Sequence, residues 1–186
     1  MIYYYWKILL DKIIAVIGII FCAILLWWWI IIINLFMYRK PFFVQKRVGQ
    51  YNKIFKLYKF RTLPINTPKY QSQEECQSKP NAFGWFLRRF RLDETLQFIN
   101  ILRGNMSLIG PRPCLENQYE LLQLRKEYHV HFLRPGITGY AQIHGTLSDQ
   151  TKALYDKDYL ERISFKTDLY IFFKTFSTVI KIKDLE

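Results

Sequence analysis

Hydrophobic residues are concentrated at the start of the chain. No charged side chain occurs from Ile13 to Tyr38, and a helix over this run reaches about 39 Å, enough to cross the hydrocarbon core of a bilayer. A cleavable signal peptide has a shorter apolar region and a small-residue cleavage site, which this segment lacks. The pattern therefore predicts a retained membrane-anchoring helix within residues 1–38 and one further domain over residues 39–186.

The pattern after the anchor predicts a short β-hairpin. Residues 42–49 are rich in strand formers. Residues 54–60 alternate, with Phe55, Leu57 and Lys59 on one side of a strand. We expect the two segments to pair through a turn that begins at a glycine.

The next segments predict a loop and several helices. Residues 63–82 contain three prolines among polar residues, so we predict an exposed loop and a candidate lid. From Phe83 onward, apolar residues at helical spacing and arginines around them predict a basic amphipathic helix. Such a helix could lie at a membrane surface, or it could equally pack its apolar side against the core with its basic side in solvent. Residues 156–182 predict two helices with a connection near Ser164, the last of them buried against the domain or wetted by lipid.

Charge is unevenly distributed along the chain. The net charge is +12, and residues 38–112 carry 15 Lys/Arg against 4 Asp/Glu, whereas residues 113–186 carry 10 of each. This excess of positive charge indicates one of two things. The first half of the domain faces an anionic partner, namely lipid headgroups, a nucleotide diphosphate or nucleic acid, or it is simply a solvated basic face. We expect no nucleic acid, because neither a binding motif nor a stacking platform is present.

The charges that flank the apolar run leave its topology open. Lys7 and Lys12 precede the run, and Arg39 and Lys40 follow it. A spanning helix usually has one basic flank, on the cytoplasmic side, whereas a helix that enters and returns to the same face would have two. The signal at the first flank is weakened by Asp11, so both topologies stay open, with the re-entrant one favoured.

The cysteines and histidines do not indicate a metal site or a disulfide framework. The three cysteines, Cys22, Cys76 and Cys114, form no CxxC pair, which fits a reducing, cytoplasmic compartment. None of the three histidines has a carboxylate or thiol at ligand spacing.

Two acidic residues stand where a helix would begin. Asp93 and Glu94 precede an apolar helical pattern that ends at Gly104. Carboxylates at a helix start are common dipole partners. Taken alone, the pair therefore favours a structural charge pair over a catalytic site.

Two arginines lie on loops that contain proline. In residues 107–113 the prolines fix the backbone on both sides of Arg112, and we expect neither a regular helix nor a central strand there. Residues 134–139 again pair Arg134 with a proline, and their two glycines would let backbone approach a ligand. A guanidinium held on a stiff loop loses less entropy when it binds phosphate.

Four segments, in this order, carry a resemblance to a known family: Lys59-Phe60-Arg61-Thr62, Arg91-Leu92-Asp93-Glu94, Met106-Ser107-Leu108-Ile109-Gly110-Pro111-Arg112-Pro113 and Arg134-Pro135-Gly136-Ile137-Thr138-Gly139. Their order and spacing resemble the bacterial sugar transferases, the small monotopic phosphoglycosyl transferases. The similarity extends from about Asp11 to Ile180 and includes Tyr159, Ser164 and Asp168. The implied fold is α+β and mainly helical, with a re-entrant or spanning membrane helix, a short β-hairpin and interfacial amphipathic helices.

The resemblance implies a reaction and a site. A UDP-sugar and a polyprenyl (undecaprenyl) phosphate would give a polyprenyl diphosphate sugar and UMP, the first step of glycan assembly, with Mg²⁺ as cofactor. By this resemblance Asp93 is the nucleophile, which forms a covalent phosphosugar, and is also the Mg²⁺ ligand. Glu94 has a supporting acid/base or positioning role. The residues expected to bind the phosphates are Arg88 and Arg112, followed by Lys59, Arg61 and Arg134.

The resemblance also implies a location. The catalytic domain would lie on the cytoplasmic face of the bacterial inner membrane, with membrane lipids as partners and a homo-oligomer left open. A non-catalytic membrane scaffold for glycan-assembly enzymes is the alternative function.

The sequence departs from the family pattern at three places. Members usually break the membrane helix with a Ser-Pro pair, whereas Ile13–Tyr38 has no proline and contains three consecutive tryptophans, which favour an interfacial depth. His144 begins a segment where members often have Asn-Gly-Arg, and Arg162 stands where asparagine is common. The last two changes bear on which sugar nucleotide is accepted.

Overall fold

A computed structural model describes residues 2–67, 78–145 and 147–180. Half of the predicted loop 63–82, residues 68–77 with Cys76, lies outside the described residues, so its role as a lid stays a prediction.

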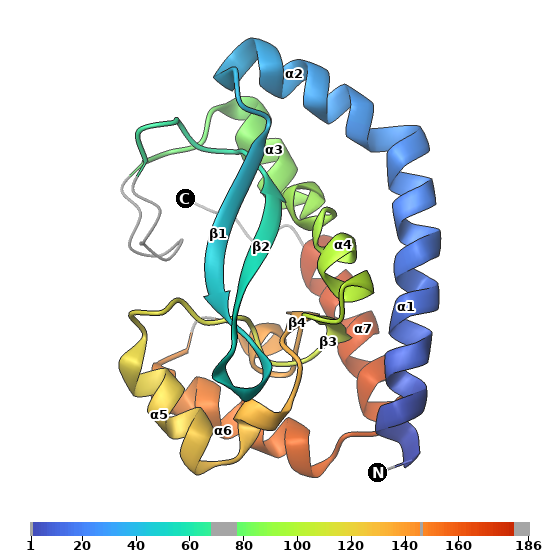
Figure 1. The fold of residues 1–186 in the computed structure, drawn as a ribbon, viewed down its shortest axis with the longest axis vertical. Coiled ribbons are helices and arrows are strands. Elements are labelled where there is room, and N and C mark those ends of the chain that lie inside the picture. Colours follow the sequence, from blue (N-terminus) through green and yellow to red (C-terminus); the bar gives the residue numbers. More distant parts are fainter. Residues whose placement is uncertain (1, 68–77, 146, 181–186) are drawn as a thin grey trace.

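A long bent helix runs along one side of the molecule (Figure 1). It consists of α1 (Ile2–Cys22), a π-helical turn (Ala23–Trp27) and α2 (Trp28–Tyr38). Figure 1 shows that the axis changes direction between α1 and α2, so that α2 crosses the end of the molecule above the hairpin. The apolar run predicted from the sequence is therefore one helix with a bend in it.

The remaining helices and strands form the body beside this helix. They are β1 (Phe42–Val48), β2 (Ile54–Phe60), α3 (Ala82–Arg89), α4 (Gln97–Leu102), β3 (Ser107–Ile109), α5 (Tyr119–Glu127), β4 (Gly136–Thr138), α6 (Asp149–Glu161) and α7 (Phe165–Ile180). Short 3₁₀ turns cover Gln50–Asn52, Leu92–Glu94, Val130–Phe132 and Ala141–His144. The mainly helical α+β fold and the two C-terminal helices are confirmed.

The predicted hairpin is also confirmed. β1 and β2 are antiparallel, in a register that pairs Phe43 with Lys59 and Arg47 with Phe55. Phe55, Leu57 and Lys59, which the alternation placed together on one side of the strand, are all buried. One face of the hairpin thus carries both core residues and a lysine that points toward the interior of the domain.

The two proline-containing loops pair with each other. β3 and β4 are parallel, with Ser107 opposite Gly136. β3 is a short edge strand of a two-stranded sheet, which agrees with the expectation of neither a regular helix nor a central strand in residues 107–113, and it ends before the first proline at position 111. A Cβ on Gly139 would lie 2.1 Å from the carbonyl oxygen of Gly110. This glycine therefore lets two backbone segments meet, which differs from the predicted approach to a ligand.

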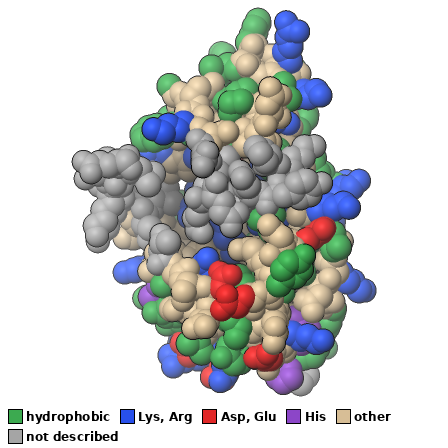
Figure 2. Space-filling model, turned by 90° about the vertical axis from the view of Figure 1, so that its left-hand side faces the viewer, with side chains coloured by type: hydrophobic (Ala, Val, Ile, Leu, Met, Phe, Trp, Pro, Cys, Tyr) green, Lys and Arg blue, Asp and Glu red, His purple; other side chains and the backbone are tan. Residues whose placement is uncertain are grey.

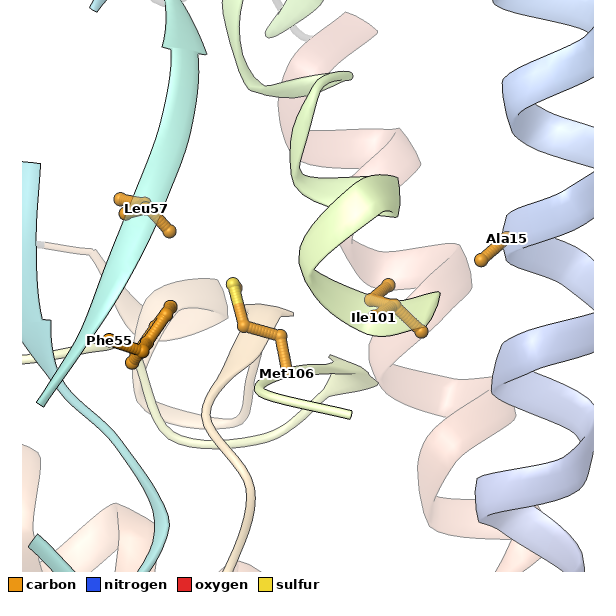
Figure 3. Close-up of a cluster of buried hydrophobic side chains, with 5 residues drawn as sticks. All are labelled: Ala15, Phe55, Leu57, Ile101 and Met106. Atoms are coloured by element: carbon orange, nitrogen blue, oxygen red, sulfur yellow. The ribbon is translucent and has the colours of Figure 1, made fainter. Parts of the chain in front are cut away.

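The anchor helix and the domain share a hydrophobic core. Ala15 of α1 is buried in one cluster with Phe55, Leu57, Ile101 and Met106. Figure 3 shows Ile101 of α4 pointing toward Ala15, and Met106 lying between Phe55 and Ile101. The division at residue 38 is thus a division of the sequence, and the packing runs across it.

A buried polar network fixes the start of α1. Lys7 Nζ lies 2.8 Å from Asp168 Oδ2 on α7, and the hydroxyl of Tyr159 donates to the other oxygen of Asp168 at 2.7 Å. One turn later, Asp11 accepts a hydrogen bond from the hydroxyl of Ser107. Lys7 and Asp11 are therefore internal charges of the domain, so the sequence argument that counted them as flanking charges was wrong.

Candidate active site

A tight turn between α3 and α4 carries the two carboxylates. Arg91 adopts a left-handed conformation (φ 53°), and Leu92–Glu94 form a 3₁₀ turn closed by a 3.1 Å hydrogen bond from the amide of Glu94 to the carbonyl of Arg91. A left-handed arginine is unusual, and such residues concentrate at functional sites. The helix expected to start at Asp93 begins at Gln97.

Both carboxylates are buried, and one of them is surrounded by cations. Asp93 is 4% exposed and Glu94 6%. Glu94 Oε1 lies 2.7 Å from Lys59 Nζ and 3.6 Å from an Arg112 nitrogen, and Glu94 Oε2 lies 3.5 Å from an Arg91 nitrogen. The two oxygens of Glu94 thus form ion pairs with three cations.

The two neighbouring carboxylates have opposite pKa shifts. Burial raises the pKa of Asp93 to about 6, against the opposing effect of Lys59 and with a further contribution from the charge of Glu94. Burial also acts to raise the pKa of Glu94, but Lys59, Arg112 and Arg91 together outweigh it and hold that pKa well below its usual range. At neutral pH Glu94 is held as a fixed anion, whereas the charge on Asp93 is poorly compensated. Such a carboxylate is the better placed of the two to react.

The structure brings together three of the five predicted phosphate-binding residues. Lys59 and Arg112 contact Glu94, and the positive charge of Arg88 acts on Asp93. The Arg88 side chain is held by a 2.8 Å hydrogen bond to the hydroxyl of Thr62. These cations come from β2, α3 and the loop after β3, so only the folded domain assembles them.

The other two predicted residues lie elsewhere. Arg61 donates to the backbone carbonyl of Lys40 at 3.0 Å, beside the end of α2. Arg134 Nε lies 3.4 Å from Gln50 Oε1 in the hairpin turn. Neither contact involves the carboxylate pair, so the structure does not group these two arginines with Asp93.

Arg47 is a cation near Arg112 and Glu94 that the sequence interpretation missed. Arg47 of β1 donates to Gln45 Oε1 at 2.8 Å and to the carbonyl of Pro113 at 3.1 Å. Burial lowers the pKa of Arg47 to about 10, and the like charge of Arg112 adds to this effect. Within the described residues, no carboxylate forms an ion pair with Arg47. The strand alternation would have placed it on the Lys59 side once the register was known.

Comparison with known sequences identifies the family. The model of the family described as bacterial sugar transferase matches residues 2–182. The chain belongs to this family.

Three relatives illustrate the similarity. The chain is 35% identical over 147 residues to the UDP-N-acetylgalactosamine-undecaprenyl-phosphate N-acetylgalactosaminephosphotransferase of Aeromonas hydrophila, covering 74% of this chain and 35% of that protein. It is 35% identical over 158 residues to the exopolysaccharide production protein ExoY of Sinorhizobium fredii, covering 74% and 69%. It is 32% identical over 178 residues to the UDP-glucose:undecaprenyl-phosphate glucose-1-phosphate transferase of Xanthomonas campestris, covering 89% and 37%. The chain thus spans little more than a third of the Aeromonas and Xanthomonas proteins.

In this bacterial sugar transferase a buried ion pair supports the loop of Arg112. Arg125 of α5 donates to Asp156 of α6 at 2.9 Å and to the backbone carbonyl of Arg112 at 2.8 Å. Both side chains of the pair are buried. Sequence patterns did not predict this role, because residues 119–127 have the composition of an ordinary charged helix and Asp156 lies 31 residues from Arg125.

Proposed function

We propose that this chain is a phosphoglycosyl transferase that moves a sugar 1-phosphate from a UDP-sugar to a polyprenyl phosphate and releases UMP. The observation that carries the proposal is the buried Asp93 beside a Glu94 that is already occupied by cations. The names of the Aeromonas and Xanthomonas relatives refer to UDP-sugars and undecaprenyl phosphate, which supports the same substrate classes.

The charge of the site supports an anionic substrate. Among the described residues, five cations contact the two carboxylates or act on them through their charge, and they are Arg47, Lys59, Arg88, Arg91 and Arg112. Positive charges therefore outnumber the two carboxylates in this part of the structure. Cations fixed in a buried site stabilise charge that develops on a phosphoryl group. A nucleotide diphosphate fits this surplus better than a neutral sugar does.

The proposed reaction has two steps. A carboxylate oxygen of Asp93 attacks the sugar-bearing phosphorus of the UDP-sugar, and the bond from that phosphorus to the bridging oxygen breaks. UMP leaves with the bridging oxygen and its electron pair, and an acyl phosphate to the sugar remains on Asp93. A phosphate oxygen of the lipid then attacks the same phosphorus, which restores the carboxylate and forms the polyprenyl diphosphate sugar.

Glu94 has a positioning role in this proposal. Its oxygens hold Lys59, Arg91 and Arg112, and its low pKa makes it a poor proton carrier at neutral pH. Of the two roles predicted for Glu94, these contacts therefore favour positioning over acid/base catalysis. The buried Glu94 also keeps the three cations from separating in the absence of substrate.

Mg²⁺ remains part of the proposal as a cofactor. The described residues contain no cluster of three or more His, Cys, Asp or Glu side chains that could hold a metal by themselves. Mg²⁺ commonly uses one or two carboxylates together with substrate phosphates, and Asp93 offers such a carboxylate because Glu94 is occupied. Bound there, Mg²⁺ would neutralise charge on the diphosphate.

The structure supports attachment to a membrane. The helix from Tyr3 to Tyr38 is long and apolar enough to cross one. Aromatic side chains are also exposed on α3, at its C-cap and on α7, and they include Trp85, Phe86, Phe90, Phe172, Phe173 and Phe176. On the face drawn in Figure 2, basic and hydrophobic side chains lie in both halves of the molecule, whereas the acidic side chains in view lie in the lower half, away from α2. We therefore propose that the α2 end meets the lipid headgroups.

A re-entrant helix fits the packing better than a spanning one. The start of the bent helix is tied to the domain by Lys7 and Asp168, and its end by a 3.3 Å hydrogen bond from the Tyr38 hydroxyl to the carbonyl of Thr62. Both ends thus contact one globular body, which lies on one side of a membrane.

This topology predicts a labelling pattern in intact cells. Single cysteines placed at Tyr5 and at Leu154, both exposed, should react with an impermeant thiol reagent only after the inner membrane is opened. A cysteine placed at Trp29 should stay protected in both cases, because it would lie in lipid. Labelling at position 5 from outside the cell would reject the re-entrant helix.

The decisive assay of the proposed function is release of UMP. Purified full-length chain is mixed with Mg²⁺, polyprenyl phosphate and each member of a UDP-sugar panel, and we expect UMP with at least one sugar. No UMP with any UDP-sugar would overturn the proposal and leave the non-catalytic scaffold. The panel would also identify the sugar.

A further inference from the structure

The bend in the membrane helix forms without proline. The π-helical turn lies between α1 and α2, and the residues on either side of it, Cys22 and Trp28, keep right-handed helical angles. A π-helical turn shifts the hydrogen-bond register and is one recognised cause of a helix bend. The Trp28 indole donates to the carbonyl of Ile24 at 3.0 Å. A carbonyl of the bent turn thus has a donor within the helix itself, which matters where lipid supplies none.

The neighbouring tryptophan connects the bend to the active turn. Trp27, the last residue of the π-helical turn, donates from its indole to the hydroxyl of Thr95 at 3.1 Å. That hydroxyl donates in turn to the carbonyl of Leu92 at 2.8 Å. Thr95 directly follows Glu94, so this chain of two hydrogen bonds spans the 3₁₀ turn that carries both carboxylates. The Trp27 ring also packs edge-on against Phe60, with the ring centroids 6.3 Å apart.

The other two tryptophans of the run point away from the site. Trp28 is 45% exposed and Trp29 54% exposed, and their rings stack on each other with centroids 4.1 Å apart. Of the three consecutive tryptophans, Trp27 is the one that contacts the active turn. The same short sequence therefore offers a test residue and a matched control.

We propose that Trp27 is a positioning residue, which holds the turn of Asp93 and Glu94 against the helix bend through Thr95. The inference rests on the proposed function for its catalytic consequence. The ion pairs of Glu94 hold the cations together, but they do not by themselves fix the turn relative to the membrane helix. The hydrophobic cluster that contains Ile30 of α2 and Leu96 also joins the helix to the turn. The hydrogen bond from Trp27 adds a directional contact that sets the depth of the nucleophile relative to the bend, and a misplacement of about 1 Å can cost about 100-fold in rate.

The test compares Trp27→Phe with Trp29→Phe in the full-length chain. Trp27→Phe keeps an aromatic ring against Phe60 and removes the hydrogen-bond donor. We expect kcat for UMP release to fall about 10-fold with the KM for UDP-sugar within about 2-fold, while Trp29→Phe stays at the wild-type rate. Thr95→Val should show a similar loss, and Thr95→Ser, which keeps the hydroxyl, should restore the rate. The double variant Trp27→Phe/Thr95→Val should be no slower than the worse single variant.

A second measurement separates this inference from the proposed function. Hydrogen exchange of the amides in residues 92–97 should be faster in Trp27→Phe than in the wild-type chain and unchanged in Trp29→Phe. If the wild-type chain releases no UMP, the proposed function fails, and the exchange comparison still tests the contact. Unchanged exchange in Trp27→Phe, or equal rate losses in Trp27→Phe and Trp29→Phe, would overturn the positioning role.

Discussion

Asp93→Asn is expected to lower the rate of UMP release by about 1,000-fold or more. An amide has nearly the shape of the carboxylate but cannot form the acyl phosphate, so the first step of the proposed reaction is lost. The fold should remain intact, because burial already disfavours the charge on Asp93 and raises its pKa to about 6. Removing that charge relieves a cost that the folded state bears at neutral pH. The thermal midpoint in detergent should therefore equal or exceed that of the wild-type chain.

Two measurements make this expectation specific. With a UDP-sugar labelled in the sugar-bearing phosphate and no lipid acceptor, the wild-type chain should retain label on Asp93, and Asp93→Asn should retain none. Glu161→Gln serves as the control, because Glu161 forms a 3.7 Å pair with the exposed Lys157 on the surface of α6, where such pairs contribute little. A turnover near the wild-type rate in Asp93→Asn would remove Asp93 from the mechanism.

Local sequence patterns predicted the elements of the site. The alternation in residues 54–60 put Lys59 on the same side of its strand as Phe55 and Leu57, and the structure shows that this side is buried. The pattern after Glu94 indicated a helix, which begins three residues later at Gln97. Both results depend on contacts between residues that are close in the sequence, for which spacing carries information.

Contacts between distant segments were not predictable in the same way. Asp168, the partner of Lys7, lies 161 residues away, so Lys7 looked like a flanking charge of the membrane helix. The carbonyl of Pro113 and the side chain of Gln45 hold Arg47 in place, but only the strand register shows that Arg47 faces the site. The helix bend has no proline to mark it, and the role of the tryptophans appears only when Thr95 is seen beside Trp27.

Lys59→Met is expected to lower both the activity and the stability of the chain. Removal of Lys59 leaves Glu94 buried with Arg91 and Arg112 at 3.5 and 3.6 Å, in place of the closer 2.7 Å contact. Loss of one partner of a buried ion pair costs about 3–5 kcal/mol, and we expect the lower value because two arginines remain. For a chain of this size, about 3 kcal/mol corresponds to a thermal midpoint lower by about 6–12 °C. The rate of UMP release should fall by about 100-fold or more, since a cation beside the reacting phosphate is lost.

The double variant Lys59→Met/Glu94→Gln distinguishes the two effects. With the less well compensated carboxylate of Glu94 also neutralised, much of the lost stability should return, whereas the activity should stay low because neither Lys59 nor the positioning carboxylate is then present. Lys56→Met is the matched control, since Lys56 is exposed on the opposite face of the same strand, and it should change neither quantity. If the double variant were as unstable as Lys59→Met, the 2.7 Å pair would not be what holds Lys59 in the site. A single variant with wild-type turnover would exclude Lys59 from binding the diphosphate.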